Sequence, residues 1–407
     1  MVLLIAGFLL KAQCITEAGW DGRQYTRLCY NDIQALYGAR LLDKDTFPYV
    51  NGSIGADGLQ GGAIEYPVLT GVFMWATAEP VDHVNDYWKI SAFALAPFAL
   101  LAAYFLARDT GWRALLWAGA PALALYAFHN WDLLAVAASV IGFYLWRREK
   151  PGWAAFSFAI GAALKLYPAV FVLPLIFDVA FRRRPEPDGP EEATRAGRLD
   201  LVGAIRTASI AAGTWLAINL PFMLKNFDGW YATYRFHEER TSNYDSIWTK
   251  GWPAWGPDKL NLVTTGLTLG SVIVILAVGW LRARKDGTYP LLQVSGALLA
   301  AVMLWGKVQS PQYTLWILPF FALLRVSLMW WAAYSIVDLM VYVGIFKWFG
   351  DQSDTRYESL WVAGVWGRAA LLAVLIVVFL ISQPSEPELS HPPPNLQPNG
   401  DRLPAQA

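Results

Sequence analysis

Charged residues are scarce in this sequence, and their scarcity excludes an ordinary water-soluble protein. Aspartate, glutamate, lysine and arginine make up 16% of its 407 residues, whereas hydrophobic residues make up 56%. A soluble chain of this length could not bury so much apolar surface in one core. The remaining apolar surface must face lipid, which predicts an integral membrane protein.

The sequence also lacks the motifs of nucleotide and metal chemistry. It has no glycine-rich phosphate loop, no dinucleotide fingerprint and no zinc pattern. With four histidines and two cysteines we expect no metal centre and no cofactor, while metal dependence stays open. Basic and acidic residues number 32 each, so no excess positive charge points to nucleic acid. Nucleotide-sugar donors and nucleic-acid partners are therefore not expected.

Long apolar runs predict membrane helices at Leu95–Leu106, Val263–Leu281, Met329–Phe346 and Trp361–Ile381. A crossing needs about 20 residues, and lipid offers backbone groups no partner outside a helix. The predicted fold is an all-α, polytopic bundle of roughly 12 spans. The apolar start of the chain, residues 1–10, covers only about half a bilayer core. From this we expect a missing N-terminal piece.

Three basic clusters, at residues 147–150, 182–198 and 282–285, predict the topology. The positive-inside rule places all three in the cytoplasm, together with both termini. We expect a transmembrane domain over residues 1–381 and a disordered, Pro-rich cytoplasmic tail over 382–407. Within the domain we predict extracytoplasmic loops at 11–66 and 225–259, a cytoplasmic loop at 182–204, outer tips at 129–132, 165–168 and 307–312, and a re-entrant or interfacial segment at 67–78.

The first outer loop carries an acid on a predicted amphipathic helix. Asp32 follows Tyr30 and Asn31, and the apolar spacing from Tyr30 to Tyr37 suits a helix lying along the membrane. The carboxyl group of Asp32 is either a solvated acid near a helix start or a functional group. Cys14 and Cys29 fall in the same loop and predict a disulfide on an oxidising face, with two unpaired thiols as the alternative.

Further polar residues gather at the predicted outer tips. Glu65 and Tyr66 close the first loop, either as a site or as a helix start before Pro67. Asp132 and Lys165 interrupt apolar runs, as a structural ion pair or as substrate ligands. Lysine, glutamine and tyrosine side chains suit phosphate and sugar hydroxyls. The candidate substrate-binding residues are Glu65, Tyr66, Asp132, Lys165, Tyr167, Arg235, His237, Arg240, Lys307, Gln309 and Gln312.

The order of these motifs resembles glycosyltransferase family 87, of the GT-C superfamily, over roughly residues 14–321. The matching segments are 29–33, 65–67, 130–132, 165–168 and 307–313, followed by Trp316 and Pro319. The resemblance implies a GT-C-like fold and an inverting transfer from a polyprenyl-phosphate sugar, such as mannose, to a glycolipid or glycan acceptor. It also implies that Asp32 acts as the general base.

The resemblance leaves several assignments open. Lys165 and Lys307 are the candidates to bind the donor phosphate, with Arg235 and Arg240 behind them. Mannose and arabinofuranose donors would present the same phosphate and lipid, and the acceptor is not readable from the sequence. We expect a multi-pass cell-membrane protein in contact with membrane lipids, with its active site outside.

Two other functional classes compete with the enzyme. A secondary transporter or lipid-linked sugar flippase would place polar groups near the bilayer midplane, often in broken helices. The motifs described above lie at outer turns instead. A GT-C-like membrane scaffold without activity is the second alternative.

Overall fold

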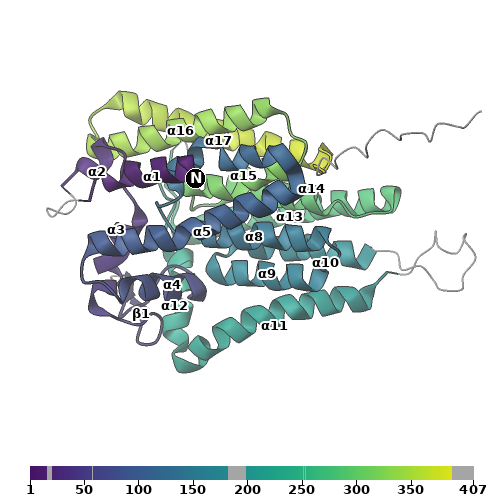
Figure 1. The fold of residues 1–407 in the computed structure, drawn as a ribbon, viewed down its shortest axis with the longest axis horizontal. Coiled ribbons are helices and arrows are strands. Elements are labelled where there is room, and N and C mark those ends of the chain that lie inside the picture. Colours follow the sequence, from purple (N-terminus) through teal and green to yellow (C-terminus); the bar gives the residue numbers. More distant parts are fainter. Residues whose placement is uncertain (16–20, 57, 182–198, 251, 253, 387–407) are drawn as a thin grey trace, which may run out of the picture.

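A computed structural model of the chain describes residues 1–15, 21–56, 58–181, 199–250, 252 and 254–386. In these ranges helices dominate, and the strands are a short hairpin of β1, Ser53–Gly55, and β2, Gly58–Gln60. Most helices run along one common direction and form a bundle (Figure 1). The prediction of an all-α, polytopic membrane bundle is confirmed.

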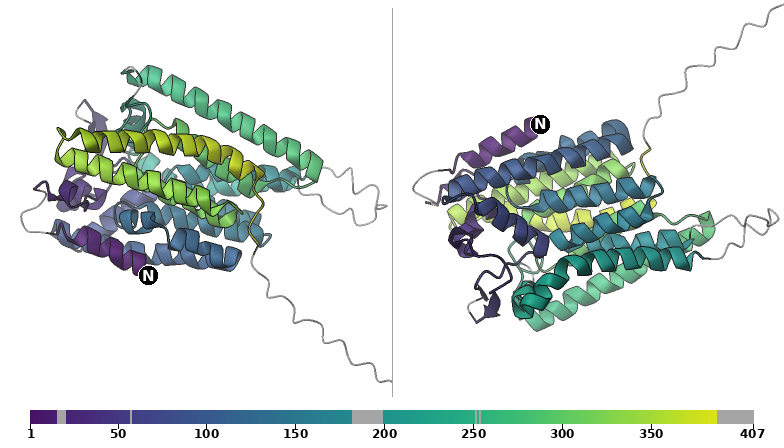
Figure 2. Two further views of the ribbon diagram at one scale, coloured as in Figure 1. Left: turned by 90° about the horizontal axis from the view of Figure 1, so that it is seen from above. Right: turned by 60° about the horizontal axis from the view of Figure 1, so that its bottom comes forward.

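Five helical segments of the described chain are long and apolar enough to cross a membrane. They contain or consist of α5, Val84–Thr110; α11, Leu201–Lys225; α13, Pro257–Asp286; α16, Leu328–Gly350; and α17, Thr355–Ile381. The four predicted apolar runs lie in α5, α13, α16 and α17. Helix α13 follows one edge of the bundle (Figure 2) and exposes large apolar side chains such as Ile273 and Val274. Such a surface suits contact with lipid.

Shorter helices build the interior of the bundle. They are α8, Asp132–Arg147; α9, Pro151–Leu164; α10, Val172–Phe181; α14, Leu291–Trp305; and α15, Thr314–Leu323. Every residue of α15 is buried, and so are most residues of α14. Helix α15 is apolar on all sides, which is typical of a helix enclosed by others. The core therefore sits around α8, α14 and α15.

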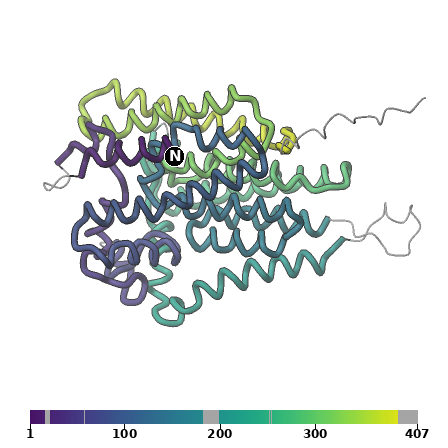
Figure 3. Tube along the Cα trace, viewed as in Figure 1, coloured from purple at the N-terminus to yellow at the C-terminus, as the bar shows by residue number. Residues whose placement is uncertain are grey.

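Several apolar segments of the chain are shorter than a bilayer crossing. Helices α1, Val2–Ala12, and α4, Val68–Ala78, have 11 residues each and rise about 16 Å. Met1 lies partway along the bundle (Figure 3). The segment 111–126 is broken into a 3-10 turn, η2, Gly111–Ala114, and two short helices, α6, Leu115–Ala118, and α7, Pro121–Tyr126. Gly119 and Pro121 favour this break, because proline lacks the amide proton that would continue the helix.

The two ends of the bundle differ in character. The loop end, as we name it, carries α2, Arg23–Thr26; α3, Asp32–Ala39; η1, Leu42–Lys44; the β1–β2 hairpin; and α12, Phe227–Glu239 (Figure 1, left). The basic end carries the clusters at 147–150 and 282–285. The loops predicted to lie outside thus share one end, and basic clusters lie at the other.

The region expected to be a disordered tail starts with an anchored segment. Ser385 donates its backbone N–H to Leu323 O at 2.8 Å, and Arg325 donates to Gln383 O at 2.8 Å. Arg147 also donates to Ser385 O at 2.7 Å. Residues 387–407 and 182–198, which carry the rest of the predicted tail and most of the predicted cytoplasmic loop, lie outside the described residues. Helix α11 already begins at Leu201, inside the predicted loop.

The close approach of α16 and α17 depends on Gly344. A Cβ atom at this position would lie 2.5 Å from the backbone N of Trp361. We predict that Gly344→Ala lowers thermal stability in detergent, because such overpacking costs about 1 to 3 kcal/mol. Gly266→Ala on α13 is the control, since nothing lies within 4 Å of its added Cβ atom. Equal melting temperatures for both variants would contradict the predicted packing.

Candidate functional site

Helix α3 is docked at the loop end by its first residues. The side chain of Asn31 caps the helix by accepting a hydrogen bond from Gln34 N at 2.8 Å. Asp32, the first helical residue, donates its backbone N–H to His129 O at 2.8 Å. Ile33 and Tyr37 are buried, so the predicted amphipathic helix packs on the bundle. The backbone of Asp32 is thereby fixed to the tip between α7 and α8.

The carboxylate of Asp32 faces two amide side chains. Its Oδ2 accepts hydrogen bonds from Asn130 Nδ2 at 2.7 Å and from Gln312 Nε2 at 3.3 Å. The side chain is 22% exposed, so it is neither fully solvated nor sealed. Burial raises the pKa of Asp32, while hydrogen bonds from Asn130 and Tyr30 and the charge of Lys165 oppose the rise. A carboxylate with a raised pKa is a stronger base than a solvated one.

Asn130 connects Asp32 to a buried ion pair. Its Oδ1 accepts a hydrogen bond from Lys165 Nζ at 3.2 Å, and Lys165 lies 2.7 Å from Asp132 Oδ1. The indole of Trp316 also donates to Asp132 Oδ1, at 2.6 Å. Asp132 and Lys165 therefore form the ion pair that was one of the two alternatives from the sequence. The side chain of Asn130 joins this pair to Asp32.

A cavity of about 400 Å³ opens beside this ion pair. Seven of the predicted substrate-binding residues line it: Glu65, Tyr66, Lys165, Tyr167, His237, Lys307 and Gln309. Apolar side chains, including Leu166, Val170 and Met303, form another part of its wall. A mixed lining of this kind suits a ligand with a charged head and an apolar chain.

Two basic groups of the cavity are held by backbone oxygens. Lys307, in the loop after α14, donates to Glu238 O at 2.9 Å and to Arg240 O at 2.8 Å. These two bonds leave one ammonium N–H for another acceptor. His237 Nε2 lies 2.9 Å from Glu65 O, and burial lowers the pKa of His237. At neutral pH the positive charge of this wall therefore comes from lysine rather than histidine.

The remaining predicted residues take other places. Asp132 lies behind Lys165, and Gln312, next to the turn η5, Pro311–Tyr313, contacts Asp32. Arg240 stacks its guanidinium 5.3 Å from the ring centre of Phe236. Arg235 does not line the cavity; it forms an exposed pair with Glu239, four residues further along α12, at 2.6 Å.

Other residues at the loop end were not predicted from the sequence. Arg40 binds Glu65 with two bonds, of 2.6 and 2.9 Å, and so joins α3 to the end of the first loop. Lys11 and His129 lie behind Asp32, almost completely buried. A lysine directly after the apolar run 2–10 was the available signal for Lys11, whereas nothing in the spacing indicates the pairing of Arg40 with Glu65.

Cys14 and Cys29 are joined in a disulfide, and their Cα atoms lie 6.0 Å apart. The bond connects the end of α1 to the segment just before Asp32. Closing a loop of this length stabilises a protein by roughly 3 kcal/mol. The disulfide thus restrains the chain that presents Asp32.

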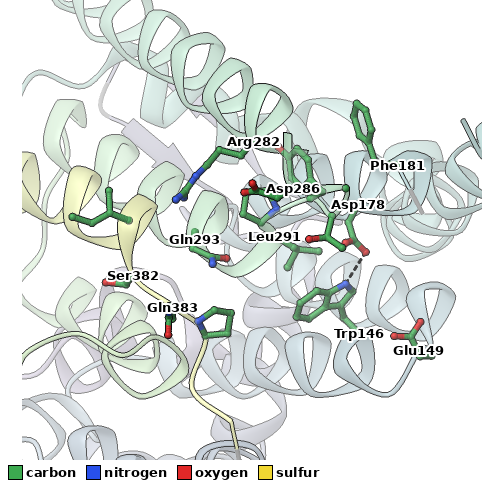
Figure 4. Close-up of a pocket in the computed structure, with 16 residues that line it drawn as sticks. Trp146, Glu149, Asp178, Phe181, Arg282, Asp286, Leu291, Gln293, Ser382 and Gln383 are labelled. Carbon is green, nitrogen blue, oxygen red and sulfur yellow. Dashed lines mark hydrogen bonds between the residues drawn. The ribbon is translucent and has the colours of Figure 1, made fainter. Parts of the chain in front are cut away.

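A larger cavity, of about 850 Å³, lies at the basic end (Figure 4). Its charged lining consists of three acids, Glu149, Asp178 and Asp286, and one base, Arg282. Arg282 already donates to Leu380 O, and Trp146 Nε1 donates to Asp178 at 2.8 Å. An excess of carboxylates repels a phosphate, so the smaller cavity at the loop end is the better anion site.

Comparison with known protein families gives one match. The model of glycosyltransferase family 87 matches residues 66–311, which is more than half of the chain. The match includes Asp132, Lys165 and Lys307, whereas Asp32 and the disulfide precede it. A search of curated proteins finds no significant match.

Labelling tests the sidedness that the basic clusters predict. Both native cysteines are in the disulfide, so introduced thiols are the only free ones. We predict that Ser53→Cys, exposed on β1, reacts with a membrane-impermeant maleimide added to intact cells. Thr288→Cys, exposed at the basic end, should react only after the membrane is permeabilised. The opposite labelling pattern would show that the chain has the inverse of the predicted topology.

Proposed function

The chain belongs to glycosyltransferase family 87, and on that basis we propose that it transfers a sugar from a polyprenyl phosphate to an envelope glycolipid or glycan outside the cell. The family and the apolar helices together make it a membrane glycosyltransferase. Mannose is the first candidate for the sugar. The loop end with the Asp32 site is, in this proposal, the extracytoplasmic end.

One observation carries the proposal: a partly exposed carboxylate and a cationic cavity are joined by a single side chain. Asn130 donates to Asp32 and accepts from Lys165, which lines the cavity. A base for the acceptor hydroxyl and a site for the donor phosphate are thus neighbours. An inverting transfer needs both groups at one sugar carbon.

In the proposed reaction, Asp32 accepts the proton of the acceptor hydroxyl as its oxygen bonds to the anomeric carbon of the sugar. The bond from that carbon to the phosphate oxygen breaks, and polyprenyl phosphate leaves with the electron pair. Negative charge grows on the phosphate, and the ammonium groups of Lys165 and Lys307 stabilise it. The apolar wall near Met303 accepts the first part of the lipid chain.

Buried polar atoms near the site also fit a sugar. Asp132 Oδ2, Gln309 Oε1 and Gln312 Oε1 have no hydrogen-bond partner in the part of the chain that the structure describes. Buried acceptors of this kind are normally satisfied, and sugar hydroxyls are suitable donors. Tyr167 stacks on Trp316 with ring centres 4.3 Å apart and gives the wall an aromatic face.

The flippase alternative has one observation in its favour. Asp338 and Arg368 lie near the middle of α16 and α17, where a transporter places charges. Both already have protein partners, because Asp338 accepts from Thr314 Oγ1 at 2.5 Å and Arg368 donates to Asp245 O at 2.9 Å. Membranes given radiolabelled polyprenyl-phosphate mannose distinguish the two: sugar on an acceptor supports the enzyme, and donor that only crosses the bilayer supports a flippase.

Replacing the proposed base tests the chemical step. We predict that Asp32→Asn lowers the transfer rate at least about 100-fold, since a general base commonly contributes 10² to 10⁴. The amide keeps the shape of the side chain, so folding should be preserved. Asp45→Asn, the same change at an exposed position of the same loop, should leave the rate unchanged. Transfer by Asp32→Asn at the wild-type rate would eliminate Asp32 as the base.

The phosphate site is tested at Lys307. We predict that Lys307→Met raises the KM for the lipid-linked donor about tenfold, because one charge-assisted hydrogen bond to phosphate is lost. Lys259→Met is the matched control, since Lys259 stacks on Trp255 and does not line the cavity. The rate is measured against donor concentration, and an unchanged KM for Lys307→Met would exclude the contact.

A further inference from the structure

Lys11 is a completely buried charge at the end of α1, and no acid lies within salt-bridge distance of it in the described residues. Its Nζ lies 2.6 Å from Tyr30 O, 2.8 Å from Tyr342 Oη and 3.2 Å from His129 Nδ1. Burying a lysine is costly unless its ammonium group is satisfied. A lysine kept at such a position therefore has a specific task or a complete set of partners.

The three partners of Lys11 fit an ammonium group. Tyr30 O can only accept a hydrogen bond. Tyr342 donates its hydroxyl proton to Leu28 O at 2.6 Å, so its oxygen is left to accept from Lys11. An ammonium group has three N–H donors, and His129 Nδ1 is the third acceptor. Burial lowers the pKa of Lys11 to about 7, whereas the charge of Asp32 opposes this fall and the three acceptors stabilise the ammonium form.

We assign the proton of the neutral His129 ring to Nε2, because Nδ1 lies 3.2 Å from the Lys11 ammonium and then accepts from it. Nε2 lies 3.9 Å from Asp32 Oδ2, which is beyond hydrogen-bond distance but directs a positive ring edge at the carboxylate. The backbone carbonyl of His129 also holds the N–H of Asp32. Lys11, His129 and Asp32 thus form a row from the buried interior to the site.

We propose that Lys11 and His129 are positioning residues that keep the Asp32 carboxylate ionised and oriented for the transfer. The proposal rests on Asp32 being the base of the proposed reaction. Lys11 does not line the substrate cavity, so its effect must pass through His129 and the electric field. The family match begins after Lys11, so nothing in it assigns a role to this residue.

Other charges also act on Asp32, and the test must separate them. Lys165 favours its ionised form, whereas Asp132 disfavours it. The further titratable groups that interact with Asp32 are Tyr30, Tyr66, Asp245 and Tyr313. Loss of Lys11 removes a cation and leaves these groups unchanged. The ionised carboxylate then becomes less favourable, and the pKa of Asp32 rises.

Titration of activity gives the first readout. We expect the acid limb of the kcat/KM profile to move to higher pH by roughly one unit in Lys11→Met, which is the order of magnitude of a charge–charge interaction through a partly buried site. Lys347→Met is the control: Lys347 donates to Thr26 O in the same first loop but does not contact this row. An acid limb that stays at its wild-type pH in Lys11→Met overturns the proposal.

A pair of substitutions at His129 covers the case in which Lys11→Met does not fold. Glutamine at 129 offers an oxygen to Lys11 and an N–H group to Asp32, whereas leucine offers neither. We expect His129→Gln to keep the wild-type acid limb and His129→Leu to move it upward. A purely structural role predicts the same profile for every variant that folds, and that result would overturn the proposal.

Infrared titration follows Asp32 without activity. The carboxyl band of Asp32 is identified by its loss in Asp32→Asn, and its midpoint should rise in Lys11→Met and in His129→Leu. An unchanged midpoint in both variants overturns the proposal. Failure of the proposed function and failure of this inference can be told apart. If Asp32→Asn keeps its activity, Asp32 is not the base. If Asp32→Asn is inactive but the Asp32 titration does not move in the other variants, only the positioning role of Lys11 and His129 is excluded.

Discussion

The candidate site depends on the contact between the first loop and the tip that precedes α8. Asp32 donates its backbone N–H to His129 O, and its carboxylate accepts from Asn130, so adjacent residues of the tip hold both parts of Asp32. The same Asn130 side chain accepts from Lys165. Without this contact the acid would belong to a surface loop and the lysine to a separate hairpin. The contact makes them one site, although 133 residues separate them in the sequence.

The cost of burying charge explains how the contact is built. Lys165 and Asp132 neutralise each other, and Trp316 donates to the same carboxylate. Arg40 neutralises Glu65, which lines the cavity. Each pair comes from different segments, so each also fixes one segment to another. A phosphate entering the cavity meets ammonium groups that are already oriented. Preorganised charges of this kind stabilise a leaving group without reorganisation during the reaction.

The apolar periodicity and the charge pattern predicted the helical membrane fold, but they could not predict which side chains contact one another in the site. The apolar runs gave α5, α13, α16 and α17, because a 20-residue apolar stretch has few alternatives in lipid. The break of the segment 111–126 into short helices was harder to predict from the sequence, since a break at Gly119 and Pro121 also depends on packing in the core. The sequence indicated Asp32 by its place on a helix of the first loop, and Lys165 and Lys307 as polar residues between apolar runs. Arg235 lies away from the cavity, because composition cannot tell which face of α12 a side chain occupies. The pairing of Arg40 with Glu65 follows only from tertiary structure.

The first loop is bound to the bundle at both of its ends, and these restraints fix the orientation of Asp32. The Cys14–Cys29 disulfide and Lys11 act on the same short stretch, because Lys11 holds Tyr30 O and, through Tyr342, Leu28 O. Arg40 and Glu65 close the other side. A base on a mobile loop would meet the acceptor in many orientations, and few of them are productive. Covalent and ionic restraints around Asp32 reduce these orientations before any substrate binds, which is the form of preorganisation that the proposed transfer requires.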